Sequence, residues 1–174
     1  MFRGLHGDKV DIVPILKRHK APDLYYEVTD YTDPWRSAPY LLLQHGFGRS
    51  SKFWYRCVPY LARYYRIIRP DLRGFGRSSA SVDPPDEFTI ETCIRDLEAI
   101  LDAVGAESVH YCGESLGGIL GMPFAAERPR RVRTLTLIGS GRMKSRTAVS
   151  GTATIRPRRV MVPTSIPSSS ATYR

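Results

Sequence analysis

The sequence predicts an α/β domain in which a mostly parallel central sheet carries helices on both faces. Short apolar segments that suit buried strands alternate with segments whose apolar residues recur at helical spacing. A chain of 174 residues that is 42% hydrophobic has enough apolar material for one domain with a sizeable core. The alternation favours a parallel sheet, because parallel neighbours have to be joined by crossover connections.

Six segments are predicted to be strands, and the sheet is expected to stop after about the sixth. Most are apolar or β-branched runs bounded by turn-forming residues. Pro14 confines the first segment to a sheet edge, because proline has no backbone N–H to donate. The six segments are residues 9–16, 24–28, 40–44, 66–70, 108–112 and 132–138.

The first helix is predicted to follow the strand at 40–44. Ser51 is expected to cap it, because a serine hydroxyl can accept a hydrogen bond from an unpaired N–H of the first turn. Pro59 is expected to break or kink it, since proline lacks the N–H that continues a helix. Its apolar face is expected to comprise Trp54, Cys57, Val58, Leu61 and Tyr65.

The second helix has the clearest helical pattern in the chain. Thr89 is expected to cap it, one apolar stripe runs through residues 90–104, and Gly105 is placed to end it. Glu91 and Arg95 are expected to pair across one turn on another face. A third helix is predicted over residues 116–127.

The net charge of +9 is concentrated at one end of the chain. Residues 142–174 hold seven Lys and Arg and no acidic residue, which leaves 19 basic against 17 acidic side chains in residues 1–141. We therefore predict a folded part at 1–141 and an unstructured basic tail, rich in Ser, Thr and Pro, at 142–174. The tail lacks the interleaved aromatic residues of a nucleic-acid surface, so no nucleic-acid partner is expected.

The abrupt end of the α/β pattern near residue 141 has a second interpretation. In this interpretation residues 142–174 are not part of the fold, because a shifted reading frame or a misjoined exon produced them. The last strand would in that case expose an unpaired edge, which favours association or instability. The oligomeric state stays open.

Cysteine usage and hydropathy narrow the class of protein further. Cys57, Cys93 and Cys112 are too few and too scattered for a disulfide framework or a zinc site, and no metal or cofactor is expected. The N-terminal residues do not resemble a signal peptide, and no run of 18 apolar residues exists. A cytoplasmic protein without membrane contact is expected.

A serine between two glycines follows the apolar strand at 108–112. In Gly113-x-Ser115-x-Gly117 the serine is predicted to occupy the tip of a sharp strand-to-helix turn. Such a turn projects the hydroxyl above the sheet in a strained backbone conformation. The residues two before and two after it then approach each other so closely that only very small side chains fit. The context of an apolar strand and a small-residue helix makes this short motif specific.

Three further segments occur in an order and context that name a family. They are His45–Gly48 after a strand, Phe53-Trp54 at the start of a helix, and Asp71-Leu72-Arg73-Gly74-Phe75-Gly76-Arg77-Ser78 after the next strand. Together with the serine motif, they resemble the α/β-hydrolase superfamily over about residues 5–141. The most similar branch is that of small lactonases, esterases and C–C-bond hydrolases, since branches with an aspartate nucleophile would not carry Ser115.

The resemblance assigns a role to each matching residue. Ser115 would be the nucleophile that forms an acyl-serine intermediate with a small carboxylic ester or lactone. The backbone N–H groups of Phe47 and Leu116 would stabilise the oxyanion of the tetrahedral intermediate. His45 and Gly46 in the first loop, with the two glycines that flank the serine, would support this geometry.

The sequence departs from the family where the acid and the histidine of the triad should follow. After Ser115 it contains one acidic side chain, Glu127, and no histidine. His45 is expected to stiffen its loop, and His110 to be a satisfied core residue. His6 and His19 are not assigned as a base. Little or no hydrolase activity is therefore expected of this chain, because a serine without its base is a poor nucleophile.

The sequence also allows other interpretations. Without its triad acid and histidine, the chain could be a non-catalytic α/β-hydrolase-like binding protein or a truncated product without a role. Alternatively, residues 46–51 would start a dinucleotide-binding unit with Asp71 at the end of the next strand, although Ser51 stands where the third glycine belongs. The nucleotide interpretation is the weaker one, because the helix that follows contains a proline.

Overall fold

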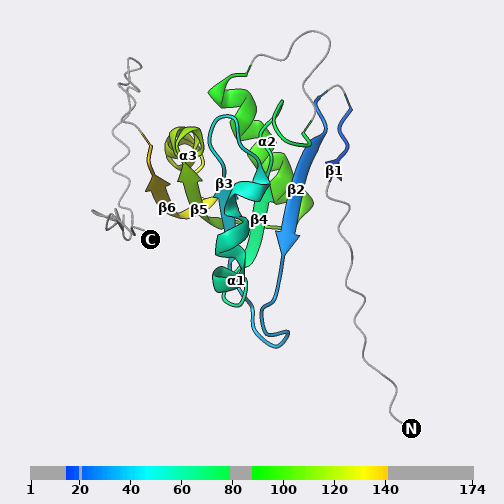
Figure 1. The fold of residues 1–174 in the computed structure, drawn as a ribbon, viewed down its shortest axis with the longest axis vertical. Coiled ribbons are helices and arrows are strands. Elements are labelled where there is room, and N and C mark those ends of the chain that lie inside the picture. Colours follow the sequence, from blue (N-terminus) through cyan, green and yellow to red (C-terminus); the bar gives the residue numbers. More distant parts are fainter. Residues whose placement is uncertain (1–14, 20, 79–87, 141–174) are drawn as a thin grey trace, which may run out of the picture.

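The computed structural model describes residues 15–19, 21–78 and 88–140, which form a twisted six-stranded sheet with helices against it (Figure 1). The predicted strand residues 9–14 and the predicted tail at 142–174 lie outside the described residues. The elements, in chain order, are β1 (Ile15–Leu16), β2 (Leu24–Thr29), β3 (Tyr40–Gln44), the 3₁₀ helix η1 (Ser51–Cys57), α1 (Val58–Leu61), β4 (Arg66–Pro70), α2 (Ile90–Ala103), β5 (Val109–Glu114), α3 (Leu116–Glu127) and β6 (Val132–Ile138).

The sheet is mostly parallel, as predicted. Its strand order is β1-β2-β4-β3-β5-β6, and β4, β3, β5 and β6 run parallel to one another. β2 runs antiparallel to both β1 and β4, and β1 lies at the edge. The carboxyl ends of the four parallel strands therefore meet at one end of the sheet, the upper end in Figure 1.

Helices cover both faces of the sheet. α2 and α3 pack on one face, where the fully buried side chains of Leu42, Ile68 and Tyr111 meet Leu97 and Phe124. On the other face η1 and α1 cover Leu41, Leu43 and Ile67, with Trp54 buried between them. Figure 1 shows α1 and α2 on opposite sides of the sheet. Along β3 and β4 successive side chains point to opposite faces, so Leu42 and Ile68 pack in one core, and Leu41, Leu43 and Ile67 in the other.

The second predicted helix is confirmed in detail. Thr89 forms a capping box with Thr92, in which each side-chain oxygen accepts the other residue's backbone N–H at 3.0–3.1 Å. Glu91 and Arg95 pair at 3.6 Å, and Gly105, with φ of +68°, follows the helix end. Ile90, predicted to begin the apolar stripe, is exposed because it precedes the part of the helix that reaches the sheet.

The first predicted helix differs from the expectation. Ser51 does not cap it, because the N-cap position is Ser50, whose side chain makes no capping hydrogen bond. The backbone N–H of Ser51 instead donates to the carboxylate of Asp71, which pulls the chain into a 3₁₀ turn. Pro59 lies in the first turn of α1, where its missing N–H costs nothing. Cys57 is exposed, although the pattern placed it on the apolar face.

A buried ion cluster joins the loop after β4 to α2. Arg73 donates two hydrogen bonds to Asp96, at 2.6 and 2.7 Å, and Arg18 lies 2.8 Å from the same carboxylate. All three side chains are largely buried. The cluster holds the 71–78 loop against α2 and the β1 segment, next to the carboxyl ends of the parallel strands.

Candidate active site

Ser115 stands at the carboxyl end of β5, between the last strand residue and the first residue of α3. Its φ is +50° and its ψ is −114°, and it is the only described residue other than glycine with a positive φ. Its N–H donates to the carbonyl of Ile138 at 2.9 Å, and its carbonyl accepts from the N–H groups of Gly118 and Ile119 at 3.0 Å. These hydrogen bonds hold a backbone conformation that costs free energy in a residue with a side chain.

The two glycines that flank the serine have no room for a side chain. A Cβ on Gly113 would lie 2.4 Å from the carbonyl carbon and oxygen of Gly117. A Cβ on Gly117 would lie 2.4 Å from the carbonyl oxygen of Gln44. The predicted close approach across the turn is therefore present, and it also brings the start of α3 against the end of β3.

The loop after β3 lies directly against the serine. A Cβ on Gly46 would lie 3.0 Å from the Cβ of Ser115 and 2.3 Å from the carboxylate of Glu114. Phe47 follows in the chain, and its side chain is 76% exposed. The loop and the serine come from separate parts of the sequence and meet because β3 and β5 are parallel neighbours.

The two predicted oxyanion donors share one property. Within the described ranges, neither the backbone N–H of Phe47 nor that of Leu116 has a hydrogen-bond acceptor. Leu116 is the first residue of α3, where the N–H groups have no partner inside the helix and where the helix dipole is positive. Their role as an oxyanion hole stays a prediction.

His45 is fully buried beneath this loop. Its Nε2 accepts a 3.0 Å hydrogen bond from the N–H of Leu72, and its Nδ1 lies 2.8 Å from the carbonyl of Gly46. A backbone N–H can only donate, so the ring proton is on Nδ1, and both nitrogens are occupied. Burial lowers the pKa of His45 below its usual value. The side chain therefore links two loops through its ring nitrogens, and neither nitrogen is available to take a proton from a serine.

Asp71 connects the same two loops from the other side. Its carboxylate accepts hydrogen bonds from the N–H groups of Ser51 and Arg77, and its backbone carbonyl accepts from the Ser78 hydroxyl at 2.8 Å. A Cβ on Gly76 would clash with this carboxylate. The carboxylate of Asp71 is therefore already engaged in holding the two loops together. The segment 46–51 leads into a 3₁₀ helix, whereas a pyrophosphate site needs the N-terminus of an α-helix.

The remaining candidates for acid and base lie away from the serine hydroxyl. His110 is half-buried in β5, where its Nδ1 lies 2.8 Å from the Thr134 hydroxyl and its ring packs against Tyr65. Glu127 is the last residue of α3 and pairs with Arg128 on the surface. A helix of that length places Glu127 about 16 Å from the turn that holds Ser115. Neither residue can form a triad with the serine.

The sequence analysis did not identify Glu114, which lies between Gly113 and Ser115. Its side chain is 16% exposed, and its Oε2 lies 3.6 Å from Nε of Arg49 at the far end of the Gly46 loop. Arg49 in turn stacks over the ring of Phe53 at 4.2 Å. Glu114 could have been identified from the sequence, because an acidic residue at the end of an apolar strand is unusual.

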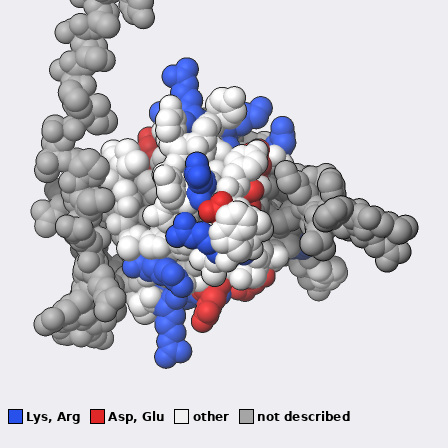
Figure 2. Space-filling view, turned by 90° about the horizontal axis from the view of Figure 1, so that it is seen from below, with Lys and Arg blue, Asp and Glu red and all other residues white. Residues whose placement is uncertain are grey.

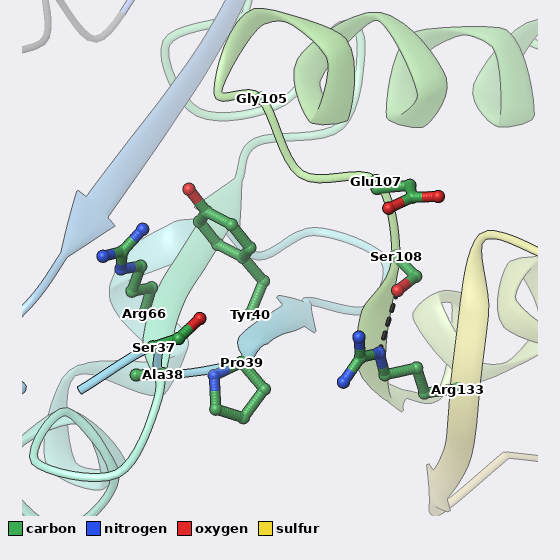
Figure 3. A pocket seen from close by; sticks show the side chains of 9 residues that line it. All are labelled: Ser37, Ala38, Pro39, Tyr40, Arg66, Gly105, Glu107, Ser108 and Arg133. Atoms are coloured by element: carbon green, nitrogen blue, oxygen red, sulfur yellow. Dashed lines mark hydrogen bonds between the residues drawn. The ribbon is translucent and has the colours of Figure 1, made fainter.

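A pocket of about 290 Å³ lies at the opposite end of the sheet, between the starts of β3, β4, β5 and β6 (Figure 3). Arg133 donates to the Ser108 hydroxyl there at 2.8 Å, and Arg66 pairs with Asp30 at 3.1 Å. Figure 2 views this lower end of the molecule and shows Lys and Arg side chains spread over it with acidic ones among them. None of the residues that line this pocket has the positive φ of Ser115, and the matched motifs lie at the other end of the sheet.

The part of the chain that the structure describes has neither a metal-binding cluster nor a membrane-spanning helix. No group of three or more His, Cys, Asp and Glu side chains in this part of the chain is arranged to hold a metal ion. None of its helices has the length and apolar character needed to cross a membrane. Burial raises the pKa of the Cys112 thiol in β5 to about 11, which leaves almost no thiolate at neutral pH.

Comparison with known proteins gives one consistent family. The alpha/beta hydrolase fold family matches residues 39–163, which extends past the expected boundary at residue 141. The division of the chain at that residue stays a prediction.

Individual relatives differ in their reactions. A protein of Azorhizobium caulinodans named "Putative carbamate hydrolase RutD" is 37% identical over 116 residues, which cover 67% of this chain and 40% of that protein. A fluoroacetate dehalogenase of a Burkholderia species is 35% identical over 104 residues, which cover 59% of this chain and 34% of that enzyme. The crystal structure of the enol-lactonase from Burkholderia xenovorans LB400 aligns with a TM-score of 0.60 and 28% identity over 66% of this chain and 42% of that one. The chain thus spans less than half the length of these three proteins.

Proposed function

Because this chain belongs to the alpha/beta hydrolase fold family, we propose that Ser115 is the nucleophile of a site for small carboxylic esters or lactones. The single observation that carries the proposal is the positive φ of Ser115 beside two N–H groups without acceptors in the described part of the chain. A protein keeps such a strained residue only where the surrounding structure demands it, and these residues cluster at functional sites. The lactonase among the structural neighbours supports this substrate class.

The proposed chemistry proceeds in two steps. Oγ of Ser115 attacks the carbonyl carbon, and the carbonyl oxygen takes the negative charge, which the N–H groups of Phe47 and Leu116 stabilise. One such donor is typically worth about 3–4 kcal/mol of activation free energy. The C–O bond to the leaving group then breaks, and the proton lost by the serine hydroxyl ends on the departing alcohol. Water next adds to the acyl carbon, the bond to Oγ breaks, and the acid is released as the serine hydroxyl regains a proton. In a lactone, the leaving alcohol stays attached to the acyl chain. A carbamate, the substrate class in the name of one relative, has the same attacked carbonyl.

A proton acceptor for the serine hydroxyl is missing from this mechanism. The ring nitrogens of His45 are both occupied, and the sequence has no histidine after His110. Removal of a triad member in serine proteases leaves only a residual rate of roughly 10³–10⁴ over water. We therefore propose that these 174 residues by themselves turn over esters slowly. A cytoplasmic location is retained as part of the proposal, with the three cysteines present as free thiols.

A non-catalytic binding protein is the second candidate. The occupied histidine and the exposed, ion-paired Glu127 favour it, since both remove the groups that would complete a triad. In this case the strained serine turn would be an inherited feature that binds a carbonyl compound without breaking a bond.

A labelling experiment separates the two candidates. The full chain is incubated with a fluorophosphonate, and the modified residue is located by mass spectrometry in the chain and in Ser115→Ala. Slow labelling confined to Ser115, with slow release of p-nitrophenol from p-nitrophenyl acetate, supports the proposal. Labelling spread over several serines, or unchanged by Ser115→Ala, contradicts the assignment of the nucleophile. Fast labelling would contradict the expected low activity.

A further inference from the structure

Three phenylalanines from three separate segments form one row at the carboxyl end of the sheet. The ring of Phe75 lies 5.4 Å from that of Phe47 and 5.9 Å from that of Phe88, both in edge-to-face contact. Phe47 is 76% exposed and Phe88 is 46% exposed, whereas Phe75 is half-buried between them. We call these three side chains the aromatic ridge.

The aromatic ridge is continuous with the proposed oxyanion site. Phe47, at one end, follows Gly46, whose backbone lies against Ser115. Phe75, in the middle, packs in the same apolar cluster as Leu116, the first residue of α3. Of the two proposed donors, Phe47 therefore belongs to the ridge, and Leu116 packs against the same apolar cluster as Phe75.

The buried ring that packs against Phe75 is that of a neutral side chain. The ring of His45 lies 6.1 Å from that of Phe75, and its two nitrogens are satisfied by the backbone. Burial lowers the pKa of this histidine, so it stays neutral near neutral pH. Two carboxylates lie next to these loops: Glu114 is 3.6 Å from Arg49, and Asp71 accepts hydrogen bonds from the N–H groups of Ser51 and Arg77.

We propose that the aromatic ridge binds the apolar acyl part of the substrate and so selects aryl and long alkyl esters over short ones. The inference rests on the proposed function, because the ridge selects a substrate only if the carbonyl is held beside Ser115. Large exposed aromatic surface is a liability in water, and it is lost when an apolar group packs on it. Edge-to-face packing also leaves ring faces open, and these favour a further aromatic group.

Binding of two esters that differ only in the acyl group tests the inference. Saturation-transfer NMR on the full chain is used to measure the affinities of ethyl phenylacetate and ethyl acetate. Ethyl phenylacetate is expected to bind about tenfold more tightly, the scale of one buried aromatic contact. Phe47→Ala and Phe88→Ala are each expected to reduce that preference about threefold or more. Phe47→Leu, which keeps apolar bulk, is expected to give an intermediate value.

Tyr60→Ala is the matched control, because Tyr60 is 78% exposed on α1, away from the carboxyl end of the strands. It should leave the preference unchanged. Equal binding of the two esters would overturn the inference, as would a preference that survives both Phe47→Ala and Phe88→Ala or falls equally in Tyr60→Ala. The measurements are repeated in Ser115→Ala, where no acylation is possible. A preference retained there supports the ridge even if the labelling experiment rejects Ser115 as a nucleophile.

Discussion

The hydrogen bond between Nε2 of His45 and the backbone N–H of Leu72 joins the loop after β3 to the loop after β4. It is 3.0 Å long and fully buried. The same contact that fixes the loop of the proposed donor Phe47 also occupies Nε2 of His45, so this histidine cannot replace the triad histidine that is absent after Ser115.

The first prediction concerns pH. Burial lowers the pKa values of both His45 and His110 in the folded protein. Unfolded histidine takes up its proton near pH ~6.5, so below that pH the unfolded state binds more protons than the folded one. The stability that these histidines contribute is complete above about pH 6.5 and is lost as the pH falls toward their folded pKa values.

Urea unfolding at about pH 7.5 and about pH 5.5 measures this loss. The free energy of unfolding should be lower at the acidic pH in the natural chain. His45→Gln should show a smaller difference between the two pH values, although its stability at the higher pH is also reduced. An unchanged difference in His45→Gln would show that this histidine does not carry the effect.

The second prediction concerns strain at the serine. Ser115→Gly should make the protein about 1 kcal/mol more stable than Ser115→Ala, because glycine adopts a positive φ without the steric cost of a Cβ. Both variants lack the hydroxyl, so the comparison isolates the backbone. Thermal unfolding of the two variants under the same conditions measures the difference, and equal midpoints would count against strain at this position.

The third prediction concerns the glycine at the start of the motif. Gly113→Ala should destabilise the fold by about 3 kcal/mol or more, since its Cβ would enter the backbone of Gly117 in a packed turn. Gly48→Ala is the control, because no atom lies within 4 Å of its Cβ position and only its φ of +69° is unfavourable. That variant should lose about 1–2 kcal/mol. Denaturant unfolding that gave both variants the same loss would contradict the proposed close approach.

The fourth prediction concerns the buried ion cluster. Asp96→Ala should cost about 3–5 kcal/mol, because it leaves the guanidinium groups of Arg73 and Arg18 buried without their carboxylate. Asp102→Ala removes a partner from the surface pair with Arg131, in which Asp102 is 67% exposed, and should cost less than about 1 kcal/mol. The ratio of the two losses is the informative quantity, and similar losses would show that burial does not decide the strength of these pairs.

Much of the fold follows from patterns that are local in the chain. The apolar run at 40–44 is a strand covered on both faces, and Thr89 caps α2 through a residue only three positions away. The glycine spacing around Ser115 likewise predicts its turn, since the steric demand acts within five residues. The family resemblance, confirmed by the match over residues 39–163, rests on the same local motifs.

Contacts between residues far apart in the sequence could not be predicted from such local patterns. Ser51 looked like a cap, but its N–H meets Asp71, twenty residues later, and the helix becomes a 3₁₀ turn. The antiparallel pairing of β2 with β4 has no local signal either, because strand direction depends on which neighbour the chain returns to.

The sequence by itself determined the α/β class, the serine turn and the absence of a histidine after it, because each depends on residue type and short spacing. Only the tertiary structure decided that both nitrogens of His45 are engaged and that Phe47, Phe75 and Phe88, from separate loops, pack in one row. Those facts depend on parallel strands that bring remote loops to one end of the sheet, and no pattern along a single segment contains that information.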